Sequence, residues 1–181
     1  MAIDRCLTLF TFALSAVFIA SCGGVKPGSG SSAKGLYTAF YVGEEGTQYF
    51  IKPLAFEGDE GRAAADFTFR LGSDSLTNAR VVISVLGDEV IRKADSVTFA
   101  NQDLYFSSDS VKLLFNERLR KNVESRIEVL VPVPYLTGLF NQADWKIVIY
   151  RSGRQTAFYA GKKTRKRIAS LRHDIFSLYT D

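Results

Sequence analysis

The sequence contains little histidine and cysteine, and this scarcity narrows the chemistry open to the protein. His173 is the only histidine, and both cysteines, Cys6 and Cys22, lie near the N-terminus. A zinc site needs several histidine or cysteine ligands, and no closely spaced carboxylates resemble a calcium loop. We therefore expect no metal ion and no other cofactor, and we interpret His173 as a surface residue.

The same scarcity argues against nucleophilic hydrolysis. A serine or cysteine nucleophile needs a base within reach, and the one imidazole stands beside Asp174 near the C-terminus. No Gly-Xaa-Ser-Xaa-Gly motif occurs in the chain. The sequence therefore assigns no catalytic residue.

Long hydrophobic runs are also missing, apart from one near the N-terminus. Arg5 precedes an uncharged apolar stretch from Cys6 to Ala20 that ends in small residues. This stretch is shorter than the roughly 20 residues that a membrane-spanning helix needs. It therefore predicts a cleaved export signal over residues 1–21 rather than a permanent anchor.

The end of this signal carries a specific motif. Ile19, Ala20, Ser21 and Cys22 place an aliphatic residue and two small residues before a cysteine. This pattern resembles the lipobox of bacterial lipoproteins. The resemblance implies that the Cys22 thiol receives a diacylglyceryl group and that the signal is cut between Ser21 and Cys22. The alternative is an ordinary secretory signal that ends in a cysteine.

The resemblance also implies a location. Lipidation would hold the protein on a bacterial membrane, facing the periplasm or the cell surface. Gly23 stands where lipoproteins retained in the inner membrane of enteric bacteria often carry Asp, so an outer membrane is favoured. Residues 22–35 are rich in glycine and serine and predict a flexible lipidated tether.

The remaining residues, 36–181, predict a single domain without disulfides. Removing the signal removes Cys6 and lipid occupies Cys22, so a hydrophobic core has to hold the fold. Apolar residues make up 46% of the chain, which is typical of globular proteins rather than disordered ones.

Apolar residues alternate with polar ones over much of this domain, which is typical of strands with one buried face. The alternating sets are Phe67, Phe69 and Leu71; Val81, Ile83 and Val85; Ile127, Val129, Val131 and Val133; and Trp145, Ile147 and Ile149. Short strands at this spacing predict an all-β antiparallel β-sandwich of the immunoglobulin-like class.

Turn residues between these strands suggest how they connect. Gly87-Asp88 predicts a tight hairpin, and Asn101-Gln102-Asp103 and Ser152-Gly153 predict short reversals. Pro53 cannot donate a ladder hydrogen bond, so we expect its strand, around residues 49–56, at a sheet edge.

One amphipathic helix is predicted at the C-terminus. Ile168, Leu171, Ile175 and Leu178 recur at spacings of three and four and share a face that we expect to pack on the sandwich. His173 belongs to the polar side.

Paired acids offer the one route to an enzyme. Glu44-Glu45, Asp59-Glu60 and Asp88-Glu89 could supply the two carboxylates that glycoside hydrolysis uses. Glycines flank these pairs, which favours solvated turns. A hydrolase acting on envelope glycans is therefore the alternative function.

The segment of residues 131–140 leaves strand periodicity and ends in a bulky apolar cluster. It contains Tyr135 and Phe140, which are candidates for docking a partner or ligand. The competing interpretation is a strand end followed by one helical turn that caps the sandwich.

The basic run is the strongest anomaly in the sequence. Residues 162–167 hold five cations, namely Lys162, Lys163, Arg165, Lys166 and Arg167. Residues 162–172 hold six bases and no acid, and the rest of the chain from Cys22 has 16 bases and 18 acids. Cations at the start of a helix oppose its dipole, so helix stability does not explain them. Plain solvation, protection of an edge strand, and binding of an anionic surface remain.

Export excludes nucleic acid as the normal partner of this run. An envelope protein, an anionic lipid or an anionic polymer remains as a candidate, besides the membrane reached through Cys22. The sequence thus favours a non-enzymatic envelope lipoprotein that binds a protein or an anionic envelope component.

Overall fold

The computed structural model describes residues 29–31, 35–72 and 78–179. The strands are β1 (Ser29–Ser31), β2 (Tyr37–Tyr41), β3 (Thr47–Gly58), β4 (Gly61–Leu71), β5 (Asn78–Gly87), β6 (Ser96–Ala100), β7 (Tyr105–Ser108), β8 (Val111–Leu119), β9 (Asn122–Pro132), β10 (Lys146–Arg151) and β11 (Arg154–Ala160). The helices are η2 (Gly43–Glu45), α2 (Val133–Phe140), α3 (Lys162–Asp174) and η3 (Phe176–Tyr179).

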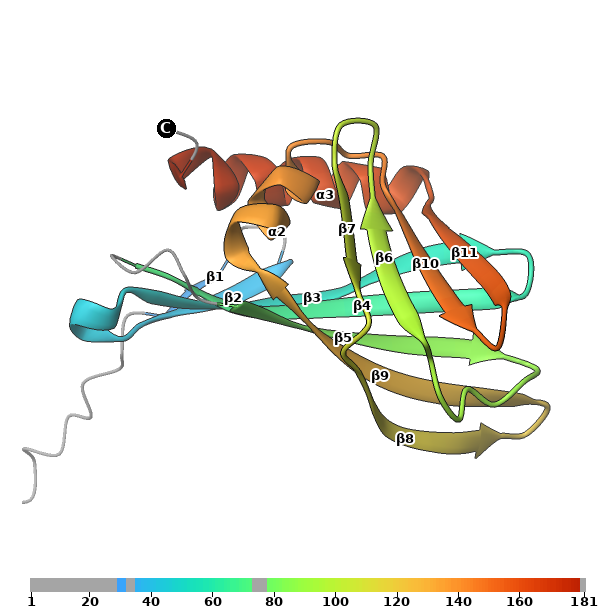
Figure 1. Cartoon of the computed structure of the whole chain (residues 1–181). Coiled ribbons are helices and arrows are strands. Elements are labelled where there is room, and N and C mark those ends of the chain that lie inside the picture. The colour runs from blue at the N-terminus through green and yellow to red at the C-terminus, as the bar shows by residue number, and fades with distance from the viewer. Residues whose placement is uncertain (1–28, 32–34, 73–77, 180–181) are drawn as a thin grey trace, which may run out of the picture.

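The strands form one antiparallel sheet that curls over itself. Its order is β7-β6-β10-β11-β3-β4-β5-β9-β8, with β2 beside β3 and β1 beside β2. In Figure 1 the arm of β6, β7, β10 and β11 rises out of the plane of the long strands β3, β4 and β5. The predicted class, an all-β antiparallel sandwich with a C-terminal helix, is confirmed.

The two end strands of the sheet, β7 and β8, are consecutive in the sequence. β7 stands at one end of the order and β8 at the other, and residues 109–110 alone separate them in sequence. The sheet therefore wraps most of the way around its core, and its concave side holds the buried residues.

Alternation places the predicted apolar residues inside. Phe67, Phe69, Val81, Ile83 and Ile127 are all buried, as the period of two predicts. Residues of the long strands and of the β6 arm meet at Trp145. Its indole lies against Phe56, Phe67, Phe99 and Phe140 at centroid distances of 4.8 to 6.3 Å. This aromatic cluster is the centre of the core.

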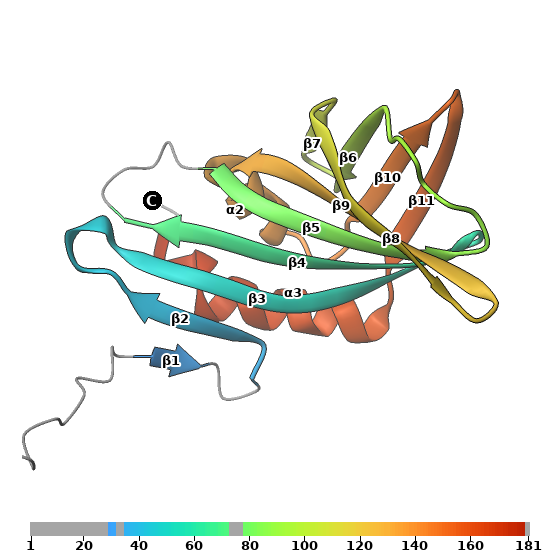
Figure 2. The same cartoon turned by 90° about the horizontal axis from the view of Figure 1, so that it is seen from below.

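Helices α2 and α3 close the concave side. Ile168, Leu171 and Ile175 are fully buried, which confirms the predicted apolar face of the C-terminal helix. Figure 2 shows α3 running behind β3 and β4. The side chain of Leu178, predicted for the same face, lies outside the described side chains.

Pro53 is not in an edge strand, so that prediction is wrong. β3 is an interior strand that pairs with β4, with β2 through residues 47–51 and with β11 through residues 56–57. Its register against β4 shifts between Ile51 and Leu54, which marks a bulge. Pro53 lies in this bulge, where a residue without an N–H interrupts no ladder bond.

The turn predictions had mixed outcomes. Asn101 and Ser152 lie in short reversals that join β6 to β7 and β10 to β11, as predicted. The Asn101 side chain accepts hydrogen bonds from the N–H groups of Asp103 and Leu104. The predicted hairpin at Gly87-Asp88 is wrong, because β5 pairs with β4 and β9 while β6 pairs with β7 and β10.

Part of the predicted tether belongs to the sheet. Residues 29–31 form β1, which pairs with β2 through Ser29 and Phe40. Cys22 and the signal segment lie outside the described residues. Among the helices that the structure describes, none is long and apolar enough to cross a membrane.

Candidate functional site

The basic run forms the beginning of α3. The helix starts at Lys162 after Gly161, which provides no side-chain cap, and its first turn contains no acid. The predicted conflict between these cations and the helix dipole is therefore present in the fold. The Glu57 carboxyl group lies nearby, since a Cβ built on Gly161 would be 3.9 Å from its oxygens.

Most of the cations on α3 face solvent without a carboxylate partner. Lys162, Lys163, Arg165 and Lys166 are exposed, and Arg167 is half-buried. Within the part of the chain that the structure describes, the only ion pair of these five residues joins Arg165 Nη1 to Asp144 Oδ2 at 3.6 Å. The charge of the run is therefore left largely uncompensated.

Three of these cations share one helical face. Lys162, Arg165 and Lys166 line a shallow groove together with Ala169, because residues at spacings of three and four are neighbours on a helix. On the other side, Thr164 is buried and donates a hydrogen bond from its hydroxyl group to the Ala55 carbonyl oxygen on β3. This bond and the buried Ile168 fix the basic face outward.

The structure removes one explanation of the run. Lysines can protect an exposed edge strand, but residues 162–167 are helical and the preceding strand β11 has neighbours on both sides, β10 and β3. Solvation and binding of an anionic surface remain.

The apolar docking candidates both lie in α2 and differ in exposure. Phe140 is 0% exposed and packs against Phe67, Trp145 and Phe176, so its predicted docking role is wrong. Tyr135 is 44% exposed and its ring lies 5.2 Å from that of Phe106. The competing interpretation, a helical cap on the fold, describes this segment better, although α2 is eight residues long, about two turns rather than one.

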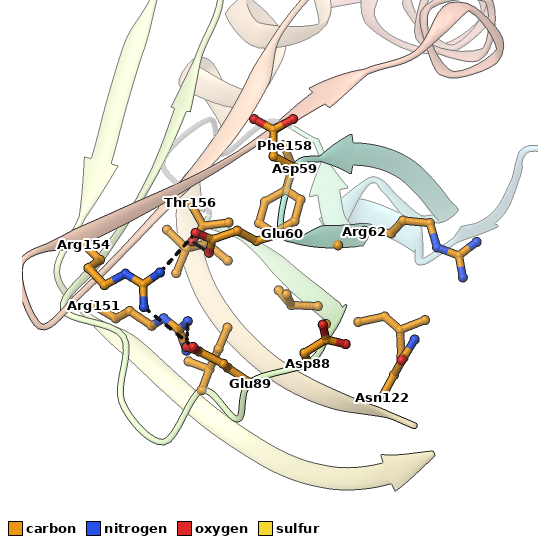
Figure 3. A pocket seen from close by; sticks show the side chains of 16 residues that line it. Asp59, Glu60, Arg62, Asp88, Glu89, Asn122, Arg151, Arg154, Thr156 and Phe158 are labelled. Atoms are coloured by element: carbon orange, nitrogen blue, oxygen red, sulfur yellow. Dashed lines mark hydrogen bonds and ion pairs between the residues drawn. The ribbon is translucent and has the colours of Figure 1, made fainter. Parts of the chain in front are cut away.

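A half-enclosed cavity that the sequence did not predict opens where four connections meet. Its volume is about 450 Å³, and its lining comes from the β3–β4 turn, the residues after β5, the start of β9 and the β10–β11 hairpin. Figure 3 shows its side chains. The signal in the sequence was the presence of charged residues beside predicted turns, namely Glu60, Glu89, Arg151 and Arg154.

An ion-pair chain crosses one wall of this cavity (Figure 3). Arg154 contacts Glu60 at 3.3 Å and Glu89 at 3.6 Å. Arg151 pairs with the same Glu89, and the Thr156 hydroxyl donates to Glu60 at 2.8 Å. The β3–β4 turn, the residues after β5 and the β10–β11 hairpin are thereby linked to one another.

The acid pairs lie in turns, as their glycines indicated. Asp59-Glu60 forms the two-residue turn between β3 and β4, and Asp88-Glu89 follows β5. Glu44-Glu45 lies in η2, where Glu45 pairs with Arg70. Arg154 brings together one member each of the first two pairs.

His173 is exposed on α3, with its Nδ1 atom 3.3 Å from the neighbouring Asp174 carboxylate. Among the described residues, no group of three histidine, cysteine, aspartate or glutamate side chains is placed to hold a metal ion. Comparison with protein-family models, with curated proteins and with solved structures found no match.

Proposed function

We propose that the protein is a lipid-anchored bacterial envelope protein whose domain binds an anionic envelope component without catalysing a reaction. One observation carries this proposal. The cations at the start of α3 lie on an outward face, where they oppose the helix dipole. Only one of the five, Arg165, has an ion pair among the described residues, with Asp144. Neither helix stability nor edge protection accounts for that placement.

The expected attraction is large enough to orient a tethered domain. A cation near an anionic membrane contributes about 1 kcal/mol, and the effect fades beyond a Debye length of roughly 8 Å at physiological salt. Lipid on Cys22 would keep the domain close to the headgroups, so that α3 encounters them repeatedly. The anchor and the basic face would act together.

Cosedimentation with lipid vesicles tests the basic face directly. The test variant changes Lys162, Lys163, Arg165, Lys166 and Arg167 to Gln. The control variant changes five exposed cations elsewhere to Gln, namely Arg92, Lys93, Lys112, Arg118 and Lys121. Both variants lose the same charge, so a difference between them reports the position of the charge rather than its amount.

We expect wild type and control to bind anionic vesicles and to release them as salt rises, because exposed charges are screened. The α3 variant should bind anionic vesicles no better than neutral ones. Equal binding by the two variants at every salt concentration would contradict the proposal and leave the run as a solvated surface.

The runner-up is a hydrolase of envelope glycans, and the cavity is what favours it. Glu60 and Glu89 converge there, as paired carboxylates would in such an enzyme. Against it, both carboxylates accept hydrogen bonds from arginines, whereas one must be a protonated acid in that chemistry. Release of sugar from an envelope glycan, abolished by Glu60→Gln, would favour this alternative.

A further inference from the structure

The cavity between the β3–β4 turn and the β10–β11 hairpin is built like a small-molecule site. Its volume of about 450 Å³ is within the range of roughly 300 to 1,000 Å³ that such sites occupy. The buried side chains of Ile91, Ile149 and Phe158 contribute to its lining, together with Val85. A hydrocarbon group that packs on these residues would be removed from contact with water, which is favourable.

The guanidinium groups of the cavity are already engaged. Arg154 contacts Glu60 and Glu89, and Arg151 donates to Glu89 and to the Val90 carbonyl oxygen at 3.4 Å. An anionic ligand would have to displace these carboxylates. The wall that carries the ion-pair chain therefore offers little to a new anion.

The opposite side of the cavity has unused acceptors. Figure 3 shows Asp88 and Asn122 apart from the ion-pair chain, whereas the charged end of Arg62 points away from the others. Within the described ranges, neither the Asp88 carboxylate nor the Asn122 side chain has a hydrogen bond or ion pair to another side chain. The lining thus holds four carboxylates, those of Asp59, Glu60, Asp88 and Glu89, and three guanidinium groups, those of Arg62, Arg151 and Arg154.

We propose that this cavity binds a small organic cation, an amine with a short hydrocarbon body. The ammonium group lies against the Asp88 carboxylate and the Asn122 side-chain oxygen, and the hydrocarbon covers Ile91 and Ile149. The ammonium supplies the one positive charge that the lining lacks. Because Asp88 is exposed, its attraction to the ammonium is that of a surface ion pair. The site is separate from α3 and does not depend on the function proposed above.

Three probes with the same carbon chain test this assignment. We would titrate n-butylammonium, n-butanol and n-butyrate into the full-length protein, purified in a neutral detergent, and follow backbone amide resonances by NMR. The cavity reporters are Gly61, Gly87 and Asn122. Butylammonium should shift them saturably, with about fivefold higher affinity than butanol, as a charge pair worth about 1 kcal/mol gives.

A pair of variants locates the cation. Asp88→Asn keeps the size of the side chain and should lower butylammonium affinity about fivefold without changing butanol affinity. Asp109→Asn, an exposed carboxylate between β7 and β8, is the matched control and should change neither. Equal affinities for butylammonium and butanol, tighter binding of butyrate, or no saturable shift with any probe would overturn the proposal. None of these outcomes bears on vesicle binding by α3.

Discussion

The ring of Phe140 stacks on the ring of Phe176, with centroids 4.5 Å apart and planes inclined by 24°. This contact joins the end of α2 to η3, the segment that follows the C-terminal helix. Phe176 also stacks on Phe69, with ring centroids 5.5 Å apart, so the contact continues to β4. The C-terminal segment is thus held to the sheet through aromatic rings.

Phe140→Ala should therefore destabilise the domain by about 3 to 5 kcal/mol, because it leaves a cavity where four aromatic rings meet. Tyr135→Ala, five residues earlier on the same helix, should cost within about 1 kcal/mol because its ring is half exposed. Urea unfolding followed by circular dichroism measures both. Similar losses for the two variants would contradict the assignment of Phe140 to the core.

Sequence pattern was sufficient where a residue's neighbours along the chain decide its environment. Strand alternation at Phe67 and Ile127 and helical spacing at Ile168 and Leu171 each predicted burial, and the structure agrees. Pro53 shows the limit of such reasoning. Its missing N–H excludes a ladder bond, but either an edge or a bulge meets that requirement, and only the pairing partners decide between them.

The cavity could not be predicted from the sequence for the same reason. Glu60, Glu89 and Arg154 come from three connections that are distant in sequence, and the curl of the sheet brings them together. Taken alone, each acid pair at the cavity has the sequence of a solvated turn, and each pair does lie in a turn or bend. The docking prediction for Phe140 was wrong for another reason. A short apolar segment after a strand has the same composition whether it caps a core or stays exposed.

Asp66 on β4 should make stability depend on pH in an unusual direction. Burial raises the pKa of Asp66 above its ordinary value of 3.8, although Arg126 and Arg80 act to lower it. The folded state therefore favours the protonated acid more than the unfolded state does. The contribution of this group is fully present below the unfolded pKa and is lost as pH rises through the folded pKa.

Asp66→Asn removes this loss while keeping the shape of the side chain. Relative to wild type, the variant should be more stable at about pH 7 than at about pH 2.5, where wild-type Asp66 is protonated in both states. Urea unfolding at the two pH values gives the difference, with Asp109→Asn as the control for a lost exposed charge. A variant that is relatively weaker at neutral pH would mean that the Arg126 ion pair outweighs the burial.

Lipidation at Cys22 is tested by a single substitution. Cys22→Ser should leave a precursor that is neither acylated nor cut at this position, because a thioether requires the thiol. Metabolic labelling with a fatty acid and the mobility of the protein on a gel report both steps. Label retained by the variant would place the anchor elsewhere.

Gly61 should tolerate no side chain, because its backbone lies against β5 at the first residue of β4. Its φ is 135°, and an added Cβ would stand 2.2 Å from the Leu86 carbonyl oxygen. Gly153 in the β10–β11 turn has a φ of 78° but nothing within 4 Å of an added Cβ. Both alanine variants incur backbone strain, so the pair separates strain from steric overlap.

We expect Gly153→Ala to lower the free energy of unfolding by about 1 kcal/mol, from backbone strain alone. Gly61→Ala adds a collision with backbone that cannot rotate away, so it should cost about 3 kcal/mol or more. The collision would also push the β3–β4 turn away from β5, which separates Glu60 from Glu89. Thermal unfolding measures the difference between the two variants. Equal losses would show that β4 and β5 can move apart at this end of the sheet, and the cavity beside them would then have no fixed shape.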